Sequence, residues 1–359
     1  MLIKRTRLPI KEILLIGMLP GFLKKLVYRL KGYRIGKKVS IGFGSVVCGS
    51  KVAIGDYTSI GFLTIIRGKQ IDIGEHVSIG STSFLDTPFI EIGDGSHINE
   101  QVFVGGLQFP DSRLSMGKNC QIMQMSFLNP ARWIRIGDDS GIGGNCLLFG
   151  HNSWLSRFEG YPVDFEPIEI GRSVSVSWGA FLLPGTKVGD GAVIGAHSVV
   201  HRSVPEKCLA IGFPARVVSK YPDFPKEVGD EEKLTLFQGI VTEMIEFFKG
   251  SGLVCQSESP VYNVMKSRNQ LMRRTGKSWR FRVADKDLSD EAPQLETHAM
   301  DVLLSLWTIP EKLRQRLNKR EIMWIDVENK EQSDHDNDLG REIVLFLRRY
   351  GVRFNRIKA

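Results

Sequence analysis

Hydrophobic residues recur at a fixed spacing through the first two thirds of the chain, and most of them are followed by glycine. One series of such pairs begins at Ile35, Ile54, Ile73 and Ile92, which are 19 residues apart. A second series follows six residues later, at Ile41, Ile60 and Ile79. The spacing resumes at Met116 and becomes unbroken six-residue steps from Ile170 to Val200. Because side chains alternate along a strand, one inward aliphatic residue per six predicts short strands, each ending in a tight corner that favours glycine.

Three such strands and their corners make one coil of 18 to 19 residues. A single coil cannot bury its aliphatic residues, whereas stacked coils bury them in one continuous column. The pattern therefore predicts a parallel β-helix, a solenoid that occupies residues 35–218.

Residues 1–34 are predicted to form a helical segment before the first coil. Its apolar residues have helical spacing and alternate with lysine and arginine, which indicates an amphipathic helix; the residues concerned are Phe22, Leu23, Lys24, Lys25, Leu26, Val27, Arg29, Leu30 and Lys31. Two roles are open: a cap on the end of the solenoid, or peripheral membrane attachment through the basic face. The apolar run from Ile13 to Leu19 is too short for a signal peptide or a membrane span.

The six-residue pattern stops after Pro222, and residues 219–359 are predicted to form a small α/β extension of unknown role. A helix is expected around residues 237–248, ending at Gly250-Ser251-Gly252. Further helices are expected at residues 300–307, 311–317 and 339–350, with strands at residues 278–284 and 322–327. The acidic stretch 331–338 is expected to be a solvated loop.

Composition narrows the classes of function. The 359-residue chain is 42% hydrophobic and has a net charge of +8, which suits a phosphorylated cofactor, a lipid-linked phosphate, an anionic membrane or nucleic acid. No nucleic-acid-binding motif accompanies the charge, so nucleic acid is not expected as a partner. The five cysteines form no CxxC pair, which argues against a disulfide framework or a zinc site and favours the cytoplasm.

The last coils carry a family resemblance. Residues 170–180, 183–200 and 211–216 resemble the closing coils of the bacterial hexapeptide-repeat acetyltransferases, and the chain is similar to polysaccharide, capsule and O-antigen O-acetyltransferases. Ser177, His197 and Phe213 depart from the residues common in that family. The resemblance implies a mainly β chain built on a left-handed parallel β-helix, with acetyl-CoA as the acyl donor.

His151 is the candidate catalytic residue. Transfer of an acetyl group to a hydroxyl needs a base that removes the hydroxyl proton, and histidine suits that task. His151 follows a coil that ends at residues 146–150 and opens the non-repetitive segment 151–167. The resemblance implies that a histidine at this place is the base, acting by direct attack of a sugar hydroxyl on the acetyl carbonyl without an acyl-enzyme.

The resemblance also implies binding residues and an assembly. The residues expected to bind the cofactor are Trp178, Gly179, Ala180, Ala196, Ser198, Arg202, Pro214 and Arg216. The loop residues expected to contact the saccharide are Asn152, Trp154, Arg157 and Tyr161. Members of the family typically form homotrimers with active sites between neighbouring subunits, so a homotrimer is expected here.

The expected function is acetyl-CoA-dependent O-acetylation of a sugar in capsule or O-antigen biosynthesis. The acceptor would be a saccharide or a lipid-linked saccharide, and the location the cytoplasm or the inner face of the membrane. The alternatives are N-acetylation of a nucleotide-linked amino sugar, transfer of a longer acyl chain or to a small alcohol, and a non-catalytic scaffold. A zinc carbonic anhydrase is not favoured because residues 176–183 contain no histidine, and no metal is expected.

Overall fold

The computed structural model describes residues 8–258, 260–266, 277–286, 288 and 300–358. The chain divides into two compact units, Met1–Glu227 and Val228–Ala359, and each is described by itself. The first seven residues of the predicted helical segment lie outside the described residues. Among the residues described, no helix combines the length and the apolar character needed to cross a bilayer.

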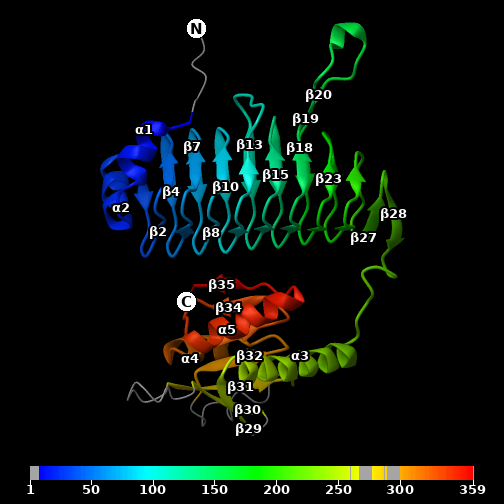
Figure 1. The fold of residues 1–359 in the computed structure, drawn as a ribbon. Coiled ribbons are helices and arrows are strands. Elements are labelled where there is room, and N and C mark those ends of the chain that lie inside the picture. Colours follow the sequence, from blue (N-terminus) through cyan, green and yellow to red (C-terminus); the bar gives the residue numbers. More distant parts are fainter. Residues whose placement is uncertain (1–7, 259, 267–276, 287, 289–299, 359) are drawn as a thin grey trace. The chain divides into compact units, whose positions relative to one another are not determined.

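The first unit is a stack of coils whose strands form three sheets (Figure 1). The strands of the first sheet are β1 (Arg34–Ile35), β4 (Lys51–Ile54), β7 (Gln70–Ile73), β10 (Phe89–Ile92), β13 (Arg113–Met116), β16 (Trp133–Ile136), β21 (Ile168–Ile170) and β24 (Lys187–Val188). Those of the second are β2 (Ser40–Ile41), β5 (Ser59–Ile60), β8 (Ser78–Ile79), β11 (His97–Ile98), β14 (Gln121–Ile122), β17 (Gly141–Ile142), β22 (Ser175–Val176), β25 (Val193–Ile194), β27 (Cys208–Gly212) and β28 (Ala215–Lys220).

The strands of the third sheet are β3 (Val46–Cys48), β6 (Ile65–Arg67), β9 (Phe84–Asp86), β12 (Phe103–Val104), β15 (Phe127–Asn129), β18 (Leu147–Phe149), β23 (Phe181–Leu182) and β26 (Val199–Val200). Neighbouring coils pair in parallel throughout, and only β28 turns back antiparallel, against β27. The expected fold class, a mainly β chain with a left-handed parallel β-helix, is confirmed.

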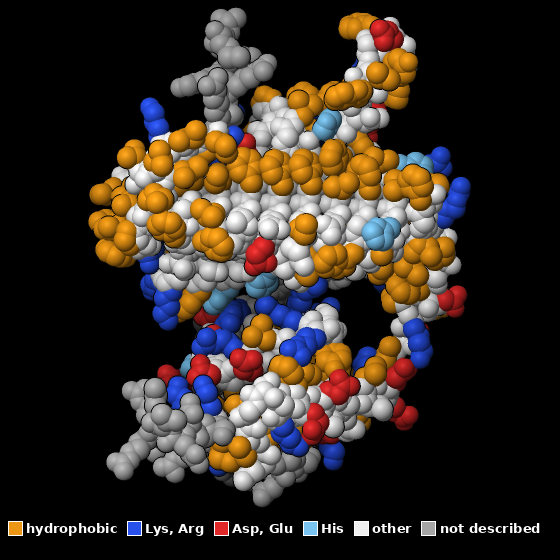
Figure 2. All heavy atoms as spheres, viewed as in Figure 1, with side chains coloured by type: hydrophobic (Ala, Val, Ile, Leu, Met, Phe, Trp, Pro, Cys, Tyr) orange, Lys and Arg blue, Asp and Glu red, His pale blue; other side chains and the backbone are white. Residues whose placement is uncertain are grey.

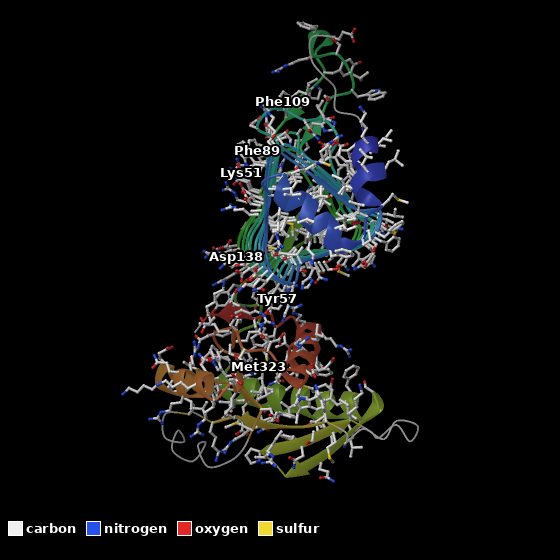
Figure 3. The ribbon with its side chains drawn as sticks, turned by 90° about the vertical axis from the view of Figure 1, so that its left-hand side faces the viewer. Lys51, Tyr57, Phe89, Phe109, Asp138 and Met323 are labelled. Atoms are coloured by element: carbon white, nitrogen blue, oxygen red, sulfur yellow. The ribbon has the colours of Figure 1, made fainter. Side chains whose placement is uncertain are left out.

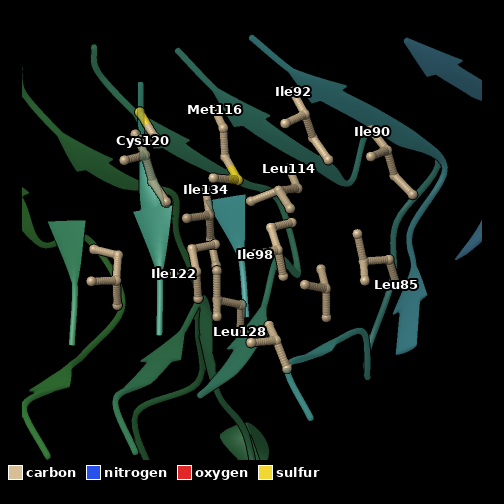
Figure 4. Packing of buried hydrophobic residues seen from close by; sticks show 14 of the residues in the cluster. Leu85, Ile90, Ile92, Ile98, Leu114, Met116, Cys120, Ile122, Leu128 and Ile134 are labelled. Atoms are coloured by element: carbon tan, nitrogen blue, oxygen red, sulfur yellow. The ribbon is translucent and has the colours of Figure 1, made fainter. Parts of the chain in front are cut away.

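The pairing register follows the repeat read from the sequence. Ile35 pairs with Ile54, Ile54 with Ile73, and Ile73 with Ile92, so residues 19 apart lie directly above one another. Their side chains point inward and are buried. Figure 4 shows how aliphatic residues from successive coils fill the interior, where Ile92 and Met116 follow each other. A shift of one residue would turn this whole set outward, so the core fixes the register.

The corners show why glycine follows the inward residue. A Cβ atom added at Gly42 would lie 2.5 Å from the carbonyl oxygen of Gly61 on the next coil. One added at Gly55 would lie 2.5 Å from the carbonyl carbon of Gly74. Main chain packs so closely against main chain at Gly42 and Gly55 that a side chain on either residue would not fit.

Buried hydroxyl groups tie the coils together at the corners. Ser126 Oγ donates to the carbonyl of Gly143 at 2.8 Å and accepts from the amide of Cys146 at 3.2 Å, both one coil further on. Thr58 makes the equivalent pair of hydrogen bonds with Gly74 and Val77. Each hydroxyl thus pairs with one amide and one carbonyl group of the next coil, two main-chain groups at the tight corner.

The N-terminal segment covers the open end of the first coil. It contains α1 (Ile10–Glu12), a π-helical turn (Ile13–Gly17) and α2 (Gly21–Leu30), and Figure 3 shows α2 lying across the end of the β-helix. From α2, the buried Lys24 Nζ donates to the carbonyls of Gly42 and Ser45, at 2.5 and 3.1 Å. The hydroxyl of Tyr28, also buried, accepts from the amide of Val47 at 2.9 Å. Polar side chains thus take the place of a preceding coil.

A row of apolar residues of α2 faces away from the β-helix, although Val27 of the same helix packs against the core. Lys24 and Tyr28, four residues apart, lie on the buried line of the helix, whereas Phe22, Leu26 and Leu30 lie on an exposed one. The usual amphipathic surface helix turns its apolar stripe toward the core, whereas here a row of large apolar residues stays exposed.

Two insertions interrupt the coils, and both leave at the corner between the third and the first sheet. Residues 105–112 separate β12 from β13, and residues 150–167 separate β18 from β21. The second insertion is a hairpin in which β19 (His151–Asn152) pairs antiparallel with β20 (Asp164–Phe165), and it carries a 3₁₀ turn at Arg157–Glu159. Figure 1 shows this hairpin projecting from the β-helix.

The second unit is a sheet with helices. Its described strands are, in spatial order, β29 (Leu253–Glu258), β30 (Val261–Lys266), β31 (Ser278–Ala284), β32 (Val302–Ser305), β33 (Met323–Asp326), β34 (Glu331–Ser333) and β35 (Asn355–Ile357). Its helices are α3 (Asp230–Gly250), α4 (Glu311–Lys319) and α5 (Asp338–Leu347), with a 3₁₀ turn at Arg348–Tyr350. The helices near residues 237–248, 311–317 and 339–350 and the strands near 278–284 and 322–327 were thus predicted correctly.

Two predictions for this unit are wrong. Residues 300–307 do not form a helix: β32 lies there, between β31 and β33, and its four residues are all buried. A strand buried on both faces is apolar throughout, so its pattern cannot be told from that of a short buried helix. The stretch 331–338 is not wholly a solvated loop, because β34 begins it and Gln332 and Ser333 are buried.

The cap predicts a specific loss of stability. Replacement of Lys24 by methionine nearly keeps the length of the side chain but removes the donor to the carbonyl of Ser45 and leaves that of Gly42 with only the amide of Ser45, at 3.3 Å. We expect the free energy of unfolding to fall by about 1–3 kcal/mol and the amides of the first coil to exchange faster with solvent. Denaturant unfolding and hydrogen exchange measure the two effects. Lys31→Met, at an exposed position on the same segment, is the matched control, and an equal loss in both variants would contradict the capping role.

Candidate active site

His151 stands at the base of the projecting hairpin. The chain leaves the third sheet at Phe149, passes Gly150 and enters β19 at His151. Gly150 is required here because an added Cβ would lie 2.9 Å from the carbonyl oxygen of Asn129 and 3.2 Å from that of Glu166. The imidazole is therefore carried on a strand end of the rigid stack and shares a hairpin with residues that extend beyond it.

Two aromatic rings flank the imidazole. The ring of Phe149 lies 5.9 Å from that of His151 between centroids, and the ring of Phe165, on the partner strand β20, lies 6.4 Å away and nearly parallel, at 9°. Phe165 is braced in turn by Phe109 of the insertion 105–112, with centroids 5.2 Å apart. Three separate segments thus converge on His151, and Phe109 is labelled in Figure 3.

The surroundings of His151 favour its neutral form. Burial lowers the pKa of the imidazole below its ordinary value of 6.5, because the charged ring loses its contact with water. Its Nδ1 atom is buried and has no hydrogen-bond partner among the described residues. The carbonyl or carboxylate that often fixes a histidine tautomer is thus not found within this part of the chain, and Nε2 is the nitrogen that remains for chemistry.

The loop residues predicted to contact a saccharide lie on the hairpin beyond His151. Asn152 lies on β19, Arg157 in the 3₁₀ turn, and Trp154 and Tyr161 on either side of that turn, all of them exposed. Trp154 is 95% exposed and touches almost nothing within the unit, so it is available to another molecule. These side chains and His151 are brought together by the hairpin.

A second cluster lies at a different corner, between the second and the third sheet. There the indole of Trp178 lies against Gly144 of the preceding coil, where no Cβ would fit. Gly179 has a φ of +69°, and an added Cβ would lie 2.5 Å from Nδ1 of His197 on the next coil. Trp178 remains 44% exposed, so one face of the indole is free to meet a ligand.

The remaining residues predicted to bind the cofactor differ in access. Ala180 and Ser198 are fully buried, and Ser198 Oγ already accepts a hydrogen bond from the amide of Gly212 at 3.0 Å. The exposed ones are Ala196, Arg202, Pro214 and Arg216, on the closing coils. Ala180 and Ser198 therefore shape the corner from within, and the exposed residues form its surface.

His151 and Trp178 are not brought together within one chain. Trp178 precedes the third sheet and His151 follows it, so the width of that sheet separates the two corners. A side of six residues at about 3.3 Å each spans about 20 Å. A reaction that used both residues would need a ligand that crosses this face, or a second chain.

An apolar ladder covers the outer face of that sheet. Its residues occupy equivalent outward positions on successive strands and are Ile65, Phe84, Phe103, Phe127, Leu147, Phe181 and Val199. The rings of Phe103 and Phe127 stack with centroids 4.8 Å apart, and Phe149 continues the row toward His151. Figure 2 shows hydrophobic side chains in a line along the β-helix. The prediction missed the ladder, although the aromatic residues keep the coil spacing in the sequence.

Among the residues that the structure describes, no three histidine, cysteine or acidic side chains cluster as a metal ion would require.

The flanking rings predict the titration of His151. We expect its imidazole to titrate below the ordinary value of 6.5 in an NMR pH titration, because burial penalises the charged form. Phe165→Ala opens one face of the ring to water, so the pKa should rise toward that value. A wild-type pKa at or above 6.5, or one unchanged by the substitution, would contradict this account.

The chain was compared with protein families, curated proteins and solved structures. No family model matches. The curated relatives include an Escherichia coli protein provisionally named lipopolysaccharide biosynthesis O-acetyl transferase WbbJ, 30% identical over 29% of this chain and 58% of the relative. The galactoside O-acetyltransferase of E. coli is 30% identical over 37% of this chain and 66% of its own length. These two matches and a third, to an acetyltransferase of Schizosaccharomyces pombe, span 42 to 66% of each relative's length.

Solved structures with some likeness are also acyltransferases. A hexapeptide-repeat acetyltransferase of Vibrio cholerae, in complex with acetyl-CoA, is 21% identical, with 40% of this chain and 69% of that chain covered and a TM-score of 0.27. The UDP-N-acetylglucosamine acyltransferase of Arabidopsis is 18% identical, with 56% and 76% covered and a TM-score of 0.39.

The sequence repeat, the coils that it forms and the named relatives agree with one another. Over part of its β-helix, this chain is similar to curated bacterial acetyltransferases.

Proposed function

We propose that this protein is an acetyl-CoA-dependent O-acetyltransferase that acts on a sugar hydroxyl in surface polysaccharide biosynthesis, of capsule or O-antigen. The observation that carries the proposal is His151: an imidazole kept neutral by burial, at the base of a hairpin with exposed aromatic and polar side chains. The related galactoside and lipopolysaccharide O-acetyltransferases support a saccharide as the acceptor.

The proposed chemistry is direct transfer. Nε2 of His151 accepts the proton of the sugar hydroxyl while the hydroxyl oxygen forms a bond to the acetyl carbonyl carbon of acetyl-CoA. The carbon–sulfur bond then breaks, and the departing CoA sulfur takes the proton from the imidazolium. Because the imidazole is neutral near pH 7, it is ready to act as a base without first losing a proton.

The binding roles follow from exposure. Acetyl-CoA would lie along the closing coils, with its pantetheine arm at the Trp178 corner and its phosphates near Arg202 and Arg216, whose guanidinium groups offer paired donors. The acceptor would meet the hairpin through Asn152, Trp154, Arg157 and Tyr161. Proximity of the two substrates would then supply much of the rate enhancement.

The site would be completed by a second copy of the chain. His151 and Trp178 lie at opposite edges of the third sheet, and the ladder between them offers an apolar surface on which a neighbouring chain can pack. In a closed cyclic assembly, His151 of one copy would face the Trp178 corner of the next. We therefore propose a homotrimer with active sites between its subunits.

Activity is tested by thiol release from acetyl-CoA in the presence of a panel of neutral sugars, amino sugars and nucleotide-linked amino sugars. We expect release with a hydroxyl acceptor, and a fall of about a hundred- to ten-thousandfold in His151→Ala, the usual effect of losing a general base. His335→Ala, in the second unit, is the control.

Equal release from wild type and His151→Ala would exclude the proposed base. Release with amino sugars alone would favour N-acetylation, and no release with any acceptor would favour a scaffold.

Mixing two inactive variants tests the shared site. His151→Ala retains the Trp178 corner, and Trp178→Ala retains the base. If each site takes His151 from one chain and Trp178 from its neighbour, each residue is intact in about half of the randomly mixed sites. Both are then intact in about a quarter of them. Co-expression of the two variants should then yield activity that neither shows alone. No recovery in mixed assemblies would place both residues in sites within one chain.

A further inference from the structure

We propose that the N-terminal end of the β-helix docks on the surface of an anionic phospholipid bilayer. The contact is made by the N-terminal apolar face, which consists of Leu14, Leu15, Met18, Phe22, Leu26 and Leu30. This goes beyond the proposed acetyl transfer and does not depend on it, because membrane binding is measured without substrate.

The face is exposed to an unusual degree for its size. Its six side chains are between 52 and 81% exposed, and all are large and apolar. Single exposed hydrophobic residues are ordinary on a protein surface, but a contiguous group marks a site of interaction. Figure 2 shows hydrophobic side chains gathered at the end of the β-helix that α1 and α2 cover.

The cap holds this face outward. Lys24 and Tyr28 are committed to main-chain groups of the first coil, and Lys25 adds a hydrogen bond from its Nζ to the carbonyl of Val39 at 3.1 Å. Rolling α2 to bury Phe22 and Leu26 would break these bonds and leave a buried edge unpaired, which costs more than the apolar contact returns. The exposure is therefore fixed by the fold.

The basic residues around the N-terminal apolar face favour a negatively charged surface as its partner. Residues 8–34 contain six lysines and arginines and a single acidic residue, Glu12. Lys11 and Lys31 are exposed on this segment, where they can reach lipid phosphates, and the exposed Arg29 adds positive charge while its guanidinium donates to the carbonyl of Ile35 at 3.0 Å. An apolar face with a basic border is the pattern of helices that lie in the interface of an anionic membrane.

The same charges disfavour the other occupants of an exposed apolar face. A second copy docked through this face would bring two basic borders together, and like charges at an interface cost several kcal/mol. The face also lies on the outer side of helices that cover the end of the solenoid, as expected for a contact with a broad surface. A bilayer can bury the apolar row in its acyl region and pair the basic border with its lipid phosphates.

Vesicle flotation of the full chain tests the proposal. The probes are large unilamellar vesicles of equal parts phosphatidylglycerol and phosphatidylcholine, and vesicles of phosphatidylcholine alone. We expect binding to the first, weaker binding to the second, and a loss of the difference at high salt, since salt screens the basic border.

The decisive variant is Leu15→Gln/Leu26→Gln/Leu30→Gln, which removes three side chains from the face. Half-burial of a leucine is worth about tenfold in affinity, so the partition coefficient should fall at least about a hundredfold. The matched control is Val218→Gln/Leu236→Gln/Leu345→Gln, at positions 53–55% exposed elsewhere in the chain, which should bind as the wild type does. Unchanged unfolding curves for both variants establish that the fold is intact.

Three results would overturn the proposal. They are absence of wild-type binding to the phosphatidylglycerol vesicles, equal loss in the face variant and its control, and self-association without lipid that the face variant abolishes. The last would assign the face to a second copy. None of them bears on thiol release, so the membrane contact and the acetyl transfer stand or fall separately.

Discussion

Each coil of the β-helix must place its main chain one strand spacing, about 4.8 Å, from the main chain of the next. This requirement decides which residues stand where in the first unit. At the corners it leaves no room for side chains on Gly42 and Gly55, and it allows Ser126 to bridge two coils with one hydroxyl. Residues beyond the 18 or 19 of a coil cannot be accommodated between coils, so they project outward from a corner. The two insertions do so at the same corner, which is how Phe109 comes to support Phe165 beside His151.

The same requirement fails at the first coil, which has no neighbour on one side. The unpaired main chain there needs donors and acceptors, and α2 supplies them from Lys24 and Tyr28. With Lys24 and Tyr28 on the inner side of the helix, the apolar residues Phe22, Leu26 and Leu30 are left on the outside. The hydrogen-bonding need of the edge thus creates the exposed apolar face, and a membrane contact is one use of a surface that the fold cannot hide.

The sequence predicts the parts of this structure that depend on repetition. The 19-residue spacing gives the pairing of Ile35 with Ile54, and the break in that spacing locates the hairpin at His151. The sequence does not predict which side of α2 packs against the β-helix. That orientation depends on hydrogen bonds to unpaired main-chain groups of the first coil, and residue spacing carries no information about them. The helix prediction for residues 300–307 is wrong for another reason. A short apolar run fits a buried strand and a buried helix equally well, and here pairing with the neighbouring strands β31 and β33 makes it a strand.

In the candidate site, too, residue spacing predicts positions in the chain, whereas the surroundings of a side chain depend on tertiary packing. The position of His151 after a closing coil is visible in the sequence, whereas its environment depends on Phe149, Phe165 and Phe109 from three segments. A carboxylate partner would orient the ring but would also raise its pKa and favour the charged form. Aromatic rings restrict the orientation of the imidazole while burial lowers its pKa. In the role of base that we propose for His151, this arrangement raises the share of neutral imidazole near neutral pH, in exchange for a somewhat weaker base.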